Sequence, residues 1–185
     1  EVMIAVFVLS IGLLGVAALQ LTAKKSSHQA WQRAQAVLLA DSILERLRMN
    51  PSAAASYHTG IGSSALGGGT RTTPGRDCST QSCTAAQMAA WDLWNWERRM
   101  DGKAIVDSAN RNVSGLVDPH GCIVFTAVSS SFPNTGQLRV IVSWRGTTDI
   151  SDAVTSGTAC GSGSAGSVDS RHQVIVNTYV VDERG

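Results

Sequence analysis

The sequence predicts an α+β fold in which a long N-terminal α-helix packs on a small antiparallel β-sheet. The chain has no proline before Pro51, and its apolar residues up to that point follow helical spacing. A stretch rich in glycine and serine then interrupts the helical pattern. Three later segments alternate apolar and polar side chains, which is typical of strands with one buried face: residues 122–128, 138–145 and 172–181.

The first part of the helix is suited to an apolar environment. From Val2 to Leu21 the chain is almost wholly aliphatic and carries no charge. A helix of about 20 such residues spans the hydrocarbon core of a bilayer, about 30 Å. A cleaved signal peptide fits less well, because it has a shorter apolar core, led by basic residues and followed by a cleavage site. Residues 1–21 are therefore predicted to lie in a membrane or in the core of an assembly.

Residues 22–50 continue the same helix but are amphipathic. Asn50 precedes Pro51 and is disfavoured in helical geometry, so the helix should end near Met49. This gives one helix of about 48 residues, about 70 Å long. We expect its second half to pack on a soluble domain of residues 51–185 through one apolar stripe, namely Trp31, Ala34, Val37 or Leu38, Leu44 and Leu47.

The soluble part divides into three predicted regions. Residues 51–83 are expected to form a long surface loop, and residues 84–100 a short helix that begins with a capping box of Thr84 and Gln87. Residues 113–185 hold the sheet, with a hairpin turn at 133–136 and a flexible loop at 156–167. The inward face of the short helix is predicted from its large apolar residues, Met88, Trp91, Leu93 and Trp94.

The four cysteines indicate an oxidising compartment, since their number is even and the chain has an anchor-like leader. Of the three possible pairings we favour the one that joins Cys78 to Cys83, which bracket a short loop, and Cys122 to Cys160. A zinc site is disfavoured because only one close cysteine pair exists and the histidines are scattered.

One charge pattern points the other way. Lys24 and Lys25 directly follow the apolar run, and basic residues at that position favour a cytoplasmic location for the C-terminal side of the chain. We give the cysteines more weight, because charges that precede Glu1 in a precursor also affect orientation.

Composition and motifs exclude several classes of function. The net charge is +1, from 15 basic and 14 acidic residues, so no bulk electrostatic field is available to bind nucleic acid. The motifs of serine hydrolases and zinc proteases are absent. Residues 161–166 match G-x-G-x-x-G but lie in a predicted loop with no convincing helix after it, which disfavours a dinucleotide site. We therefore predict no enzyme activity and no cofactor.

The N-terminal sequence resembles a known family. Glu1 followed by VMIAVFVLSIGLLGVAALQ is similar to the mature N-termini of type IV pilins and of the pseudopilins of type II secretion. Two further stretches are similar to minor pilins of the PilV type: the amphipathic continuation that ends near Met49-Asn50-Pro51, and CTAAQMAAWDLWNW at residues 83–96. Unlike many major pilins, the leading helix contains no internal proline, although Gly12 and Gly15 are able to loosen it.

The resemblance implies a structural role. Glu1 aligns with a near-invariant glutamate of the family, which sets axial register by pairing with the α-amino group of a neighbouring subunit, and a few mature residues are expected to precede it. The segment after Glu1 is similar to a filament-core helix, which would be made by Val2, Ile4, Phe7, Leu9, Ile11, Gly12, Leu14 and Gly15.

The resemblance also implies a location and partners. The subunit is expected to cross the bacterial inner membrane once, with its C-terminal domain in the periplasm, and to reach the cell surface in a pilus. The implied partners are other minor pilins, the major pilin, a large tip adhesin and the inner-membrane assembly platform. Two alternatives remain open: a minor pseudopilin of a type II secretion system, and a solitary membrane-anchored binding domain.

Overall fold

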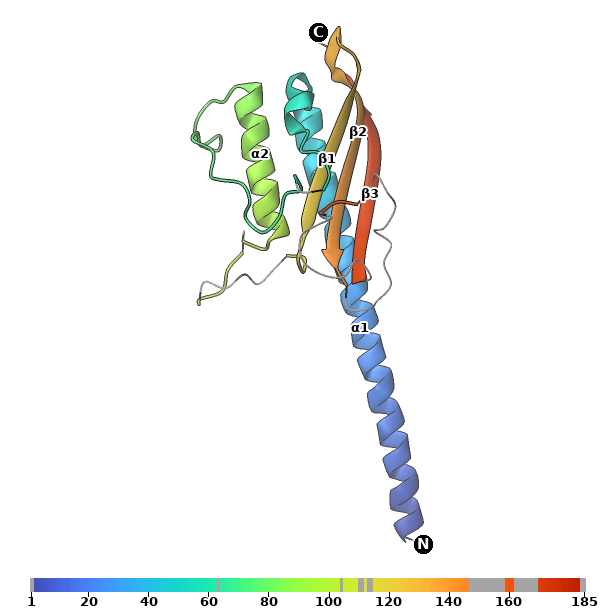
Figure 1. Cartoon of the computed structure of the whole chain (residues 1–185). Helices are drawn as coiled ribbons and strands as arrows, with labels where there is room; N and C mark the ends of the chain where they lie inside the picture. Colours follow the sequence, from blue (N-terminus) through green and yellow to red (C-terminus); the bar gives the residue numbers. More distant parts are fainter. Residues whose placement is uncertain are drawn as a thin grey trace. The chain divides into compact units, whose positions relative to one another are not determined.

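The computed structural model describes residues 2–62, 64–103, 105–109, 112, 115–146, 159–161 and 170–183. The elements in chain order are α1 (Val2–Met49), the 3-10 helix η1 (Pro51–Tyr57), α2 (Ala85–Met100), and the strands β1 (His120–Ser129), β2 (Phe132–Arg145) and β3 (Arg171–Val180) (Figure 1). The chain forms two compact units, Glu1–Ala34 and Gln35–Gly185. The predicted α+β class is confirmed, and α1 ends before Asn50-Pro51, as the backbone restriction ahead of proline requires.

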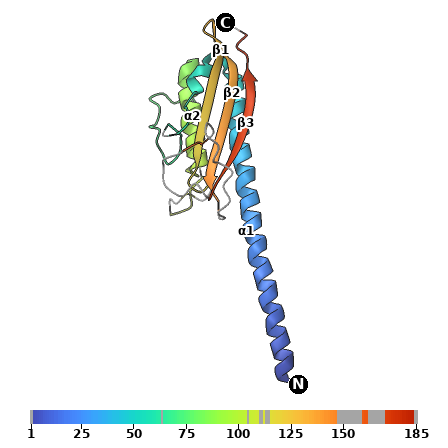
Figure 2. The ribbon, with the colours of Figure 1, turned by 45° about the vertical axis from the view of Figure 1, so that its right-hand side comes forward.

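The second unit is built on a three-stranded antiparallel sheet in the order β1-β2-β3. Its apolar face packs against α2 and residues 36–47 of α1, which lie on the same side of the sheet (Figure 2). Strand residues with alternate spacing supply the core, as a period of two dictates: Ile123, Phe125, Leu138, Val140, Val142 and Trp144.

The stripe by which α1 enters this core differs from the predicted one. Val37 is 39% exposed and Leu38 is 63% exposed, and Trp31 and Ala34 are exposed as well, whereas Leu44 and Leu47 are buried as expected. The prediction relied on apolar residues that recur at a spacing of about 3.5 residues. The fold instead uses alanines, which let the helix backbone approach its neighbours closely. The buried stripe is Ala36, Leu39, Ala40, Ile43, Leu44 and Leu47.

The inward face of α2 also differs from the prediction. Of the residues expected there, only Leu93 is buried, while Met88, Trp91 and Trp94 are partly exposed. Two carboxylates occupy the buried face, and a hydrophobic pattern cannot reveal them. The buried residues are Ala89, Asp92, Leu93, Trp96, Glu97 and Met100. The predicted capping box of Thr84 and Gln87 is present at the start of the helix.

The predicted hairpin turn was placed wrongly. The chain turns at 130–131, where Ser129 pairs with Phe132, and residues 133–136 lie inside β2. The register is irregular at this point. Asn134 donates from its Nδ2 to the Ser52 carbonyl, 2.7 Å away, and thereby fastens β2 to η1. The turn-forming residues therefore build an irregular segment of strand that holds a neighbouring element.

The segment expected as a surface loop, 51–83, contributes to the core. It begins with η1, whose Ala53, Ala54 and Tyr57 are buried. Further along, Gly60 and Leu66 form isolated bridges to β1. Gly67 has a φ of +140°, and a Cβ there would lie 2.1 Å from the Pro119 carbonyl oxygen, so the close approach of the loop requires glycine. Most of the predicted loop 156–167 lies outside the described residues.

Candidate assembly helix and its polar supports

The first unit is one helix with its apolar side chains facing outward. The residues predicted to form an assembly core are all exposed on it, and their large side chains range from Ile11 at 58% to Val2 at 78%. In the described part of the chain, no heavy atom lies within 4 Å of a Cβ built on Gly12 or Gly15, apart from the helix's own backbone and the residues next in the chain. Glu1, the predicted register residue, lies outside the described residues.

Two hydroxyl groups on the apolar part of this helix bond to its own backbone. Ser10 donates from its hydroxyl to the Val6 carbonyl at 2.7 Å, and Thr22 donates to the Ala18 carbonyl at 3.1 Å. An 18-residue window has a mean hydropathy of 2.8, so by length and composition α1 is able to cross a membrane. Such a segment is stable either in lipid or in a bundle of similar helices, because both surroundings are apolar.

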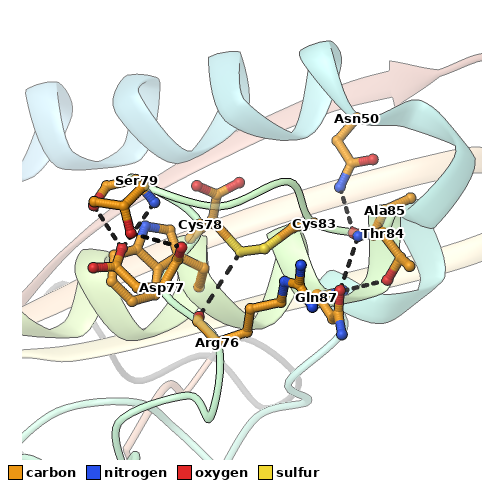
Figure 3. The surroundings of a disulfide bond; sticks show 12 residues. Asn50, Arg76, Asp77, Cys78, Ser79, Cys83, Thr84, Ala85 and Gln87 are labelled. Atoms are coloured by element: carbon orange, nitrogen blue, oxygen red, sulfur yellow. Dashed lines mark hydrogen bonds between the residues drawn. A yellow bond between two sulfur atoms is a disulfide. The ribbon is translucent and has the colours of Figure 1, made fainter.

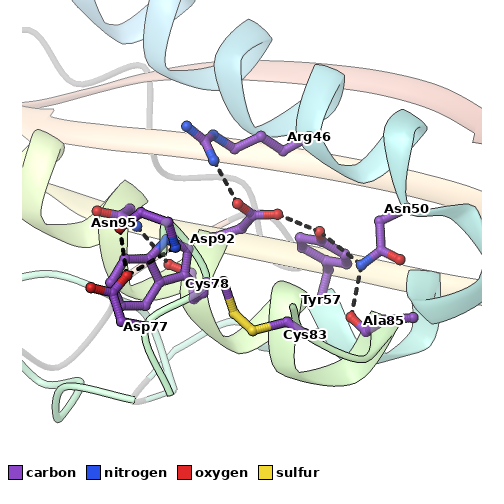
Figure 4. Close-up of polar contacts among 11 residues, drawn as sticks. Arg46, Asn50, Tyr57, Asp77, Cys78, Cys83, Ala85, Asp92 and Asn95 are labelled. Atoms are coloured by element: carbon purple, nitrogen blue, oxygen red, sulfur yellow. Dashed lines mark hydrogen bonds and ion pairs between the residues drawn. A yellow bond between two sulfur atoms is a disulfide. The ribbon is translucent and has the colours of Figure 1, made fainter. Parts of the chain in front are cut away.

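A polar network fixes the C-terminal end of α1 within the second unit (Figure 4). Asp92 of α2 accepts from Arg46 Nη1 at 2.6 Å and from the Tyr57 hydroxyl at 2.7 Å. Asn50, which comes directly after the last residue of α1, donates to the Tyr57 oxygen at 3.3 Å and to the Ala85 carbonyl at 2.8 Å. The network therefore joins α1, η1 and α2.

The protonation state of Tyr57 suits this network. Burial is the main cause that raises its pKa, and the neighbouring Asp92 raises it further. The phenol thus stays protonated and donates to the carboxylate, while Arg46 balances the charge of Asp92. A second tie between the helices comes from Trp96, whose indole Nε1 donates to the Leu39 carbonyl at 2.9 Å.

The second carboxylate of α2, Glu97, organises the loop at 67–71. Its Oε1 accepts from the amides of Gly67 at 2.9 Å and Thr70 at 2.8 Å, and from the Thr70 hydroxyl at 2.6 Å; its Oε2 accepts from the Arg71 amide at 2.9 Å. Burial alone raises the pKa of Glu97, but these hydrogen bonds outweigh it, so the pKa lies below the ordinary value for a glutamate. One ionised side chain therefore accepts the hydrogen bonds that a helix or strand partner would otherwise accept in this loop.

A third polar cluster lies at the start of β3. The buried Arg171 donates to Asp118 Oδ2 at 3.0 Å and to the Ser143 hydroxyl at 3.1 Å, and its Nη2 lies 2.7 Å from His120 Nδ1. Burial lowers the pKa of His120, and the charge of Arg171 lowers it further, which favours a neutral imidazole that accepts this hydrogen bond. The side chains of this cluster are hydrogen-bonded to one another, which is consistent with a structural role.

Both disulfides lie in the second unit. The Cys122–Cys160 bridge is buried against the outer face of the sheet and closes a separation of 38 residues, whereas Cys78–Cys83 closes only 5. Loop-closure entropy gives about 4 kcal/mol for the longer bridge and about 2 kcal/mol for the shorter one. Figure 3 shows Cys78–Cys83 between the turn at Asp77 and the N-cap of α2 at Thr84. The short bridge therefore closes the loop immediately before that helix begins.

The described residues present no metal centre. Within these ranges, no group of three histidine, cysteine or acidic side chains is placed to hold a metal ion. The G-x-G-x-x-G stretch falls mostly beyond the described residues, with only Gly161 inside them. The sequence reasoning missed the buried roles of Asp92 and Glu97. The only available signal was their position, at the spacing of the core face of α2.

A long apolar N-terminal helix that continues into the core of a small antiparallel-sheet domain defines the architecture of pilin-like subunits. In agreement with this, a family model described as type IV pilin Tt1218 (Tt1218-like) matches residues 18–94. The match runs from the apolar part of α1 through η1 and into α2 and supports a place in the type IV pilin superfamily, whose members are structural subunits. No curated protein and no solved structure matches the chain.

Proposed function

We propose that the protein is a minor pilin of a type IV pilus, which helps to prime pilus assembly and forms part of the tip complex. One observation carries this proposal most directly. The helix that packs inside the second unit continues without a break into a segment whose apolar side chains are exposed. The match to a type IV pilin family and the likeness of residues 83–96 to PilV-type minor pilins support it further.

In this proposal the apolar segment of α1 moves from the membrane to the core of a filament. Before assembly the apolar segment rests in the inner membrane, with the disulfide-bonded domain in the oxidising periplasm. On assembly the segment leaves lipid for a bundle of pilin helices, which changes its hydrophobic free energy little, so packing and polar pairs decide the outcome. The partners in this scheme are the major pilin, other minor pilins, a tip adhesin and the inner-membrane assembly platform.

Glu1 supplies the polar pair in this proposal. A carboxylate inside an apolar bundle is unfavourable unless it is paired, and the α-amino group of a neighbouring subunit fits as its partner. Glu1→Gln in the full-length protein is expected to lower incorporation into the filament by more than about tenfold, because it leaves that amine buried and unpaired. The measurement is the share of the protein recovered with sheared filaments. Recovery equal to that of the wild type would refute the role of Glu1.

Co-purification distinguishes the minor pilin from the two alternatives. Other minor pilins and a large adhesin recovered with the tagged full-length protein would support the tip complex. Components of a type II secretion system would replace that proposal with a pseudopilin. A protein recovered without any such partner would be a solitary membrane-anchored domain.

A further inference from the structure

We propose that Lys24 and Lys25 form a binding site for the headgroups of anionic phospholipids, which fixes the depth of the monomer in the membrane before assembly. The inference rests on the membrane stage of the proposed function and goes beyond it by naming the ligand class. The two lysines lie on α1, and both are exposed. They come after the apolar run that ends at Leu21, with only Thr22 and Ala23 between.

Position along the helix places these two ammonium groups at the depth of lipid phosphates. Lys24 and Lys25 lie about 5 Å beyond Leu21 at about 1.5 Å per residue. The headgroup layer on each side of a bilayer is about 5–7 Å thick. Helical side chains also tilt toward the N-terminus, and lysines near a helix end extend their ammonium groups to the interface. Both groups are therefore able to reach phosphate oxygens.

Among the described residues, no carboxylate pairs with these lysines. The sequence contains no acidic residue from Val2 to Ala40. The neighbours one helical turn away are Gln20, Leu21, His28 and Gln29. In the part of the chain that the structure describes, no ion pair joins either lysine to an acidic side chain. Two consecutive exposed cations with no counterion among the described residues attract an external anion, and at this depth the anion is a lipid phosphate.

Headgroup binding by these lysines does not depend on which side of the membrane carries the C-terminal domain. By the usual tendency they favour a cytoplasmic location for the C-terminal domain, whereas the disulfides favour the periplasm. A headgroup site is useful in either leaflet. Arg33 provides an internal comparison, because it lies about 18 Å beyond Leu21, well outside the headgroup layer and beyond the Debye length of about 8 Å at physiological salt.

The test uses the full-length protein in mild detergent with an equimolar mixture of phosphatidylglycerol and phosphatidylcholine. Native mass spectrometry then counts the lipids that remain bound. We expect the wild type to retain phosphatidylglycerol over phosphatidylcholine by at least about fivefold, the preference that one lysine near an anionic surface provides. Lys24→Gln with Lys25→Gln should remove the preference. Arg33→Gln with Arg76→Gln, which removes the same charge at two exposed positions, should keep it.

Several results would overturn the proposal. A wild type without preference, an unchanged preference in the lysine variant, or an equal loss in the arginine control would each do so. If the lysine variant instead enters filaments poorly while the wild type shows no lipid preference, the lysines serve an acidic surface of another subunit. Flotation with vesicles tests the membrane stage separately. A wild type that floats but shows no preference defeats only this inference, whereas one that does not float defeats both.

Discussion

Replacing Glu97 with alanine is expected to lower the unfolding free energy of the protein by about 3–5 kcal/mol, because it removes a buried carboxylate that accepts from four donors at once. The donors are the amides of Gly67, Thr70 and Arg71 and the Thr70 hydroxyl. The loop they belong to has no helix or strand pairing of its own over these residues, so among the described residues Glu97 takes the place of a regular backbone acceptor. In a domain of this size the loss lowers Tm by about 6–20 °C.

The measurement is thermal unfolding of the full-length protein in detergent, monitored by near-ultraviolet circular dichroism. Glu45→Ala is the matched control, since it also removes a helical glutamate, but one whose exposed pair with Arg48 contributes at most about 1 kcal/mol. Equal effects of the two substitutions would show that Glu97 does not hold the loop.

The dependence on pH gives a second check on Glu97. Its pKa is lowered in the folded state, so its contribution is fully present above the unfolded pKa of about 4.3 and is lost as the pH falls through the folded pKa. Glu97→Gln does not ionise. The difference in unfolding free energy between wild type and this variant should therefore be largest at neutral pH and shrink below about pH 4.5. A difference that stays constant from neutral to acidic pH would contradict this role.

Replacing Asp92 with alanine is expected to have a similar effect, about 3–4 kcal/mol, for a different reason. Asp92 is the acceptor for both Arg46 and Tyr57. Without it the buried Tyr57 hydroxyl has no carboxylate to accept its hydrogen bond, and the guanidinium of Arg46 loses its counterion. Asp92→Asn should destabilise less than Asp92→Ala, because the amide oxygen still accepts one hydrogen bond.

Asp41→Ala serves as the control for Asp92, because Asp41 is an exposed aspartate on α1. It should change the unfolding free energy by less than about 0.5 kcal/mol. If Asp92→Ala and Asp41→Ala destabilise equally, the network does not stabilise the junction of α1, η1 and α2.

The sequence predicts the elements of this fold better than their faces. The length of α1, the start of α2 at Thr84 and the three strands all result from local rules of spacing, capping and proline placement. The buried stripe of α1 does not follow from these rules. Ala36 and Ala40 are buried because small side chains fit the narrow space between packed elements, and not because they are strongly hydrophobic. Likewise, Asn134 carries a strong turn signal, yet its amide is used by Ser52 of another element.

The candidate site shows the same division. An unbroken apolar run such as Val2–Leu21 is visible in the sequence because the ability to span a membrane depends on composition and length alone. The supports of the second unit are not visible, since Asp92 and Glu97 are ordinary helical acids until distant residues such as Tyr57 and Thr70 are brought to them. Long-range polar contacts of this kind depend on the tertiary fold.

In the proposed function, the apolar part of α1 packs against the corresponding helices of other subunits. The most direct test replaces residues 2–21 with an unrelated transmembrane helix of equal length and keeps Glu1 and residues 22–185. We predict that the chimera stays in the membrane fraction and folds normally, but that its recovery with sheared filaments falls to background. Recovery at the level of the wild type would mean that the segment is only a tether, and would contradict the claim.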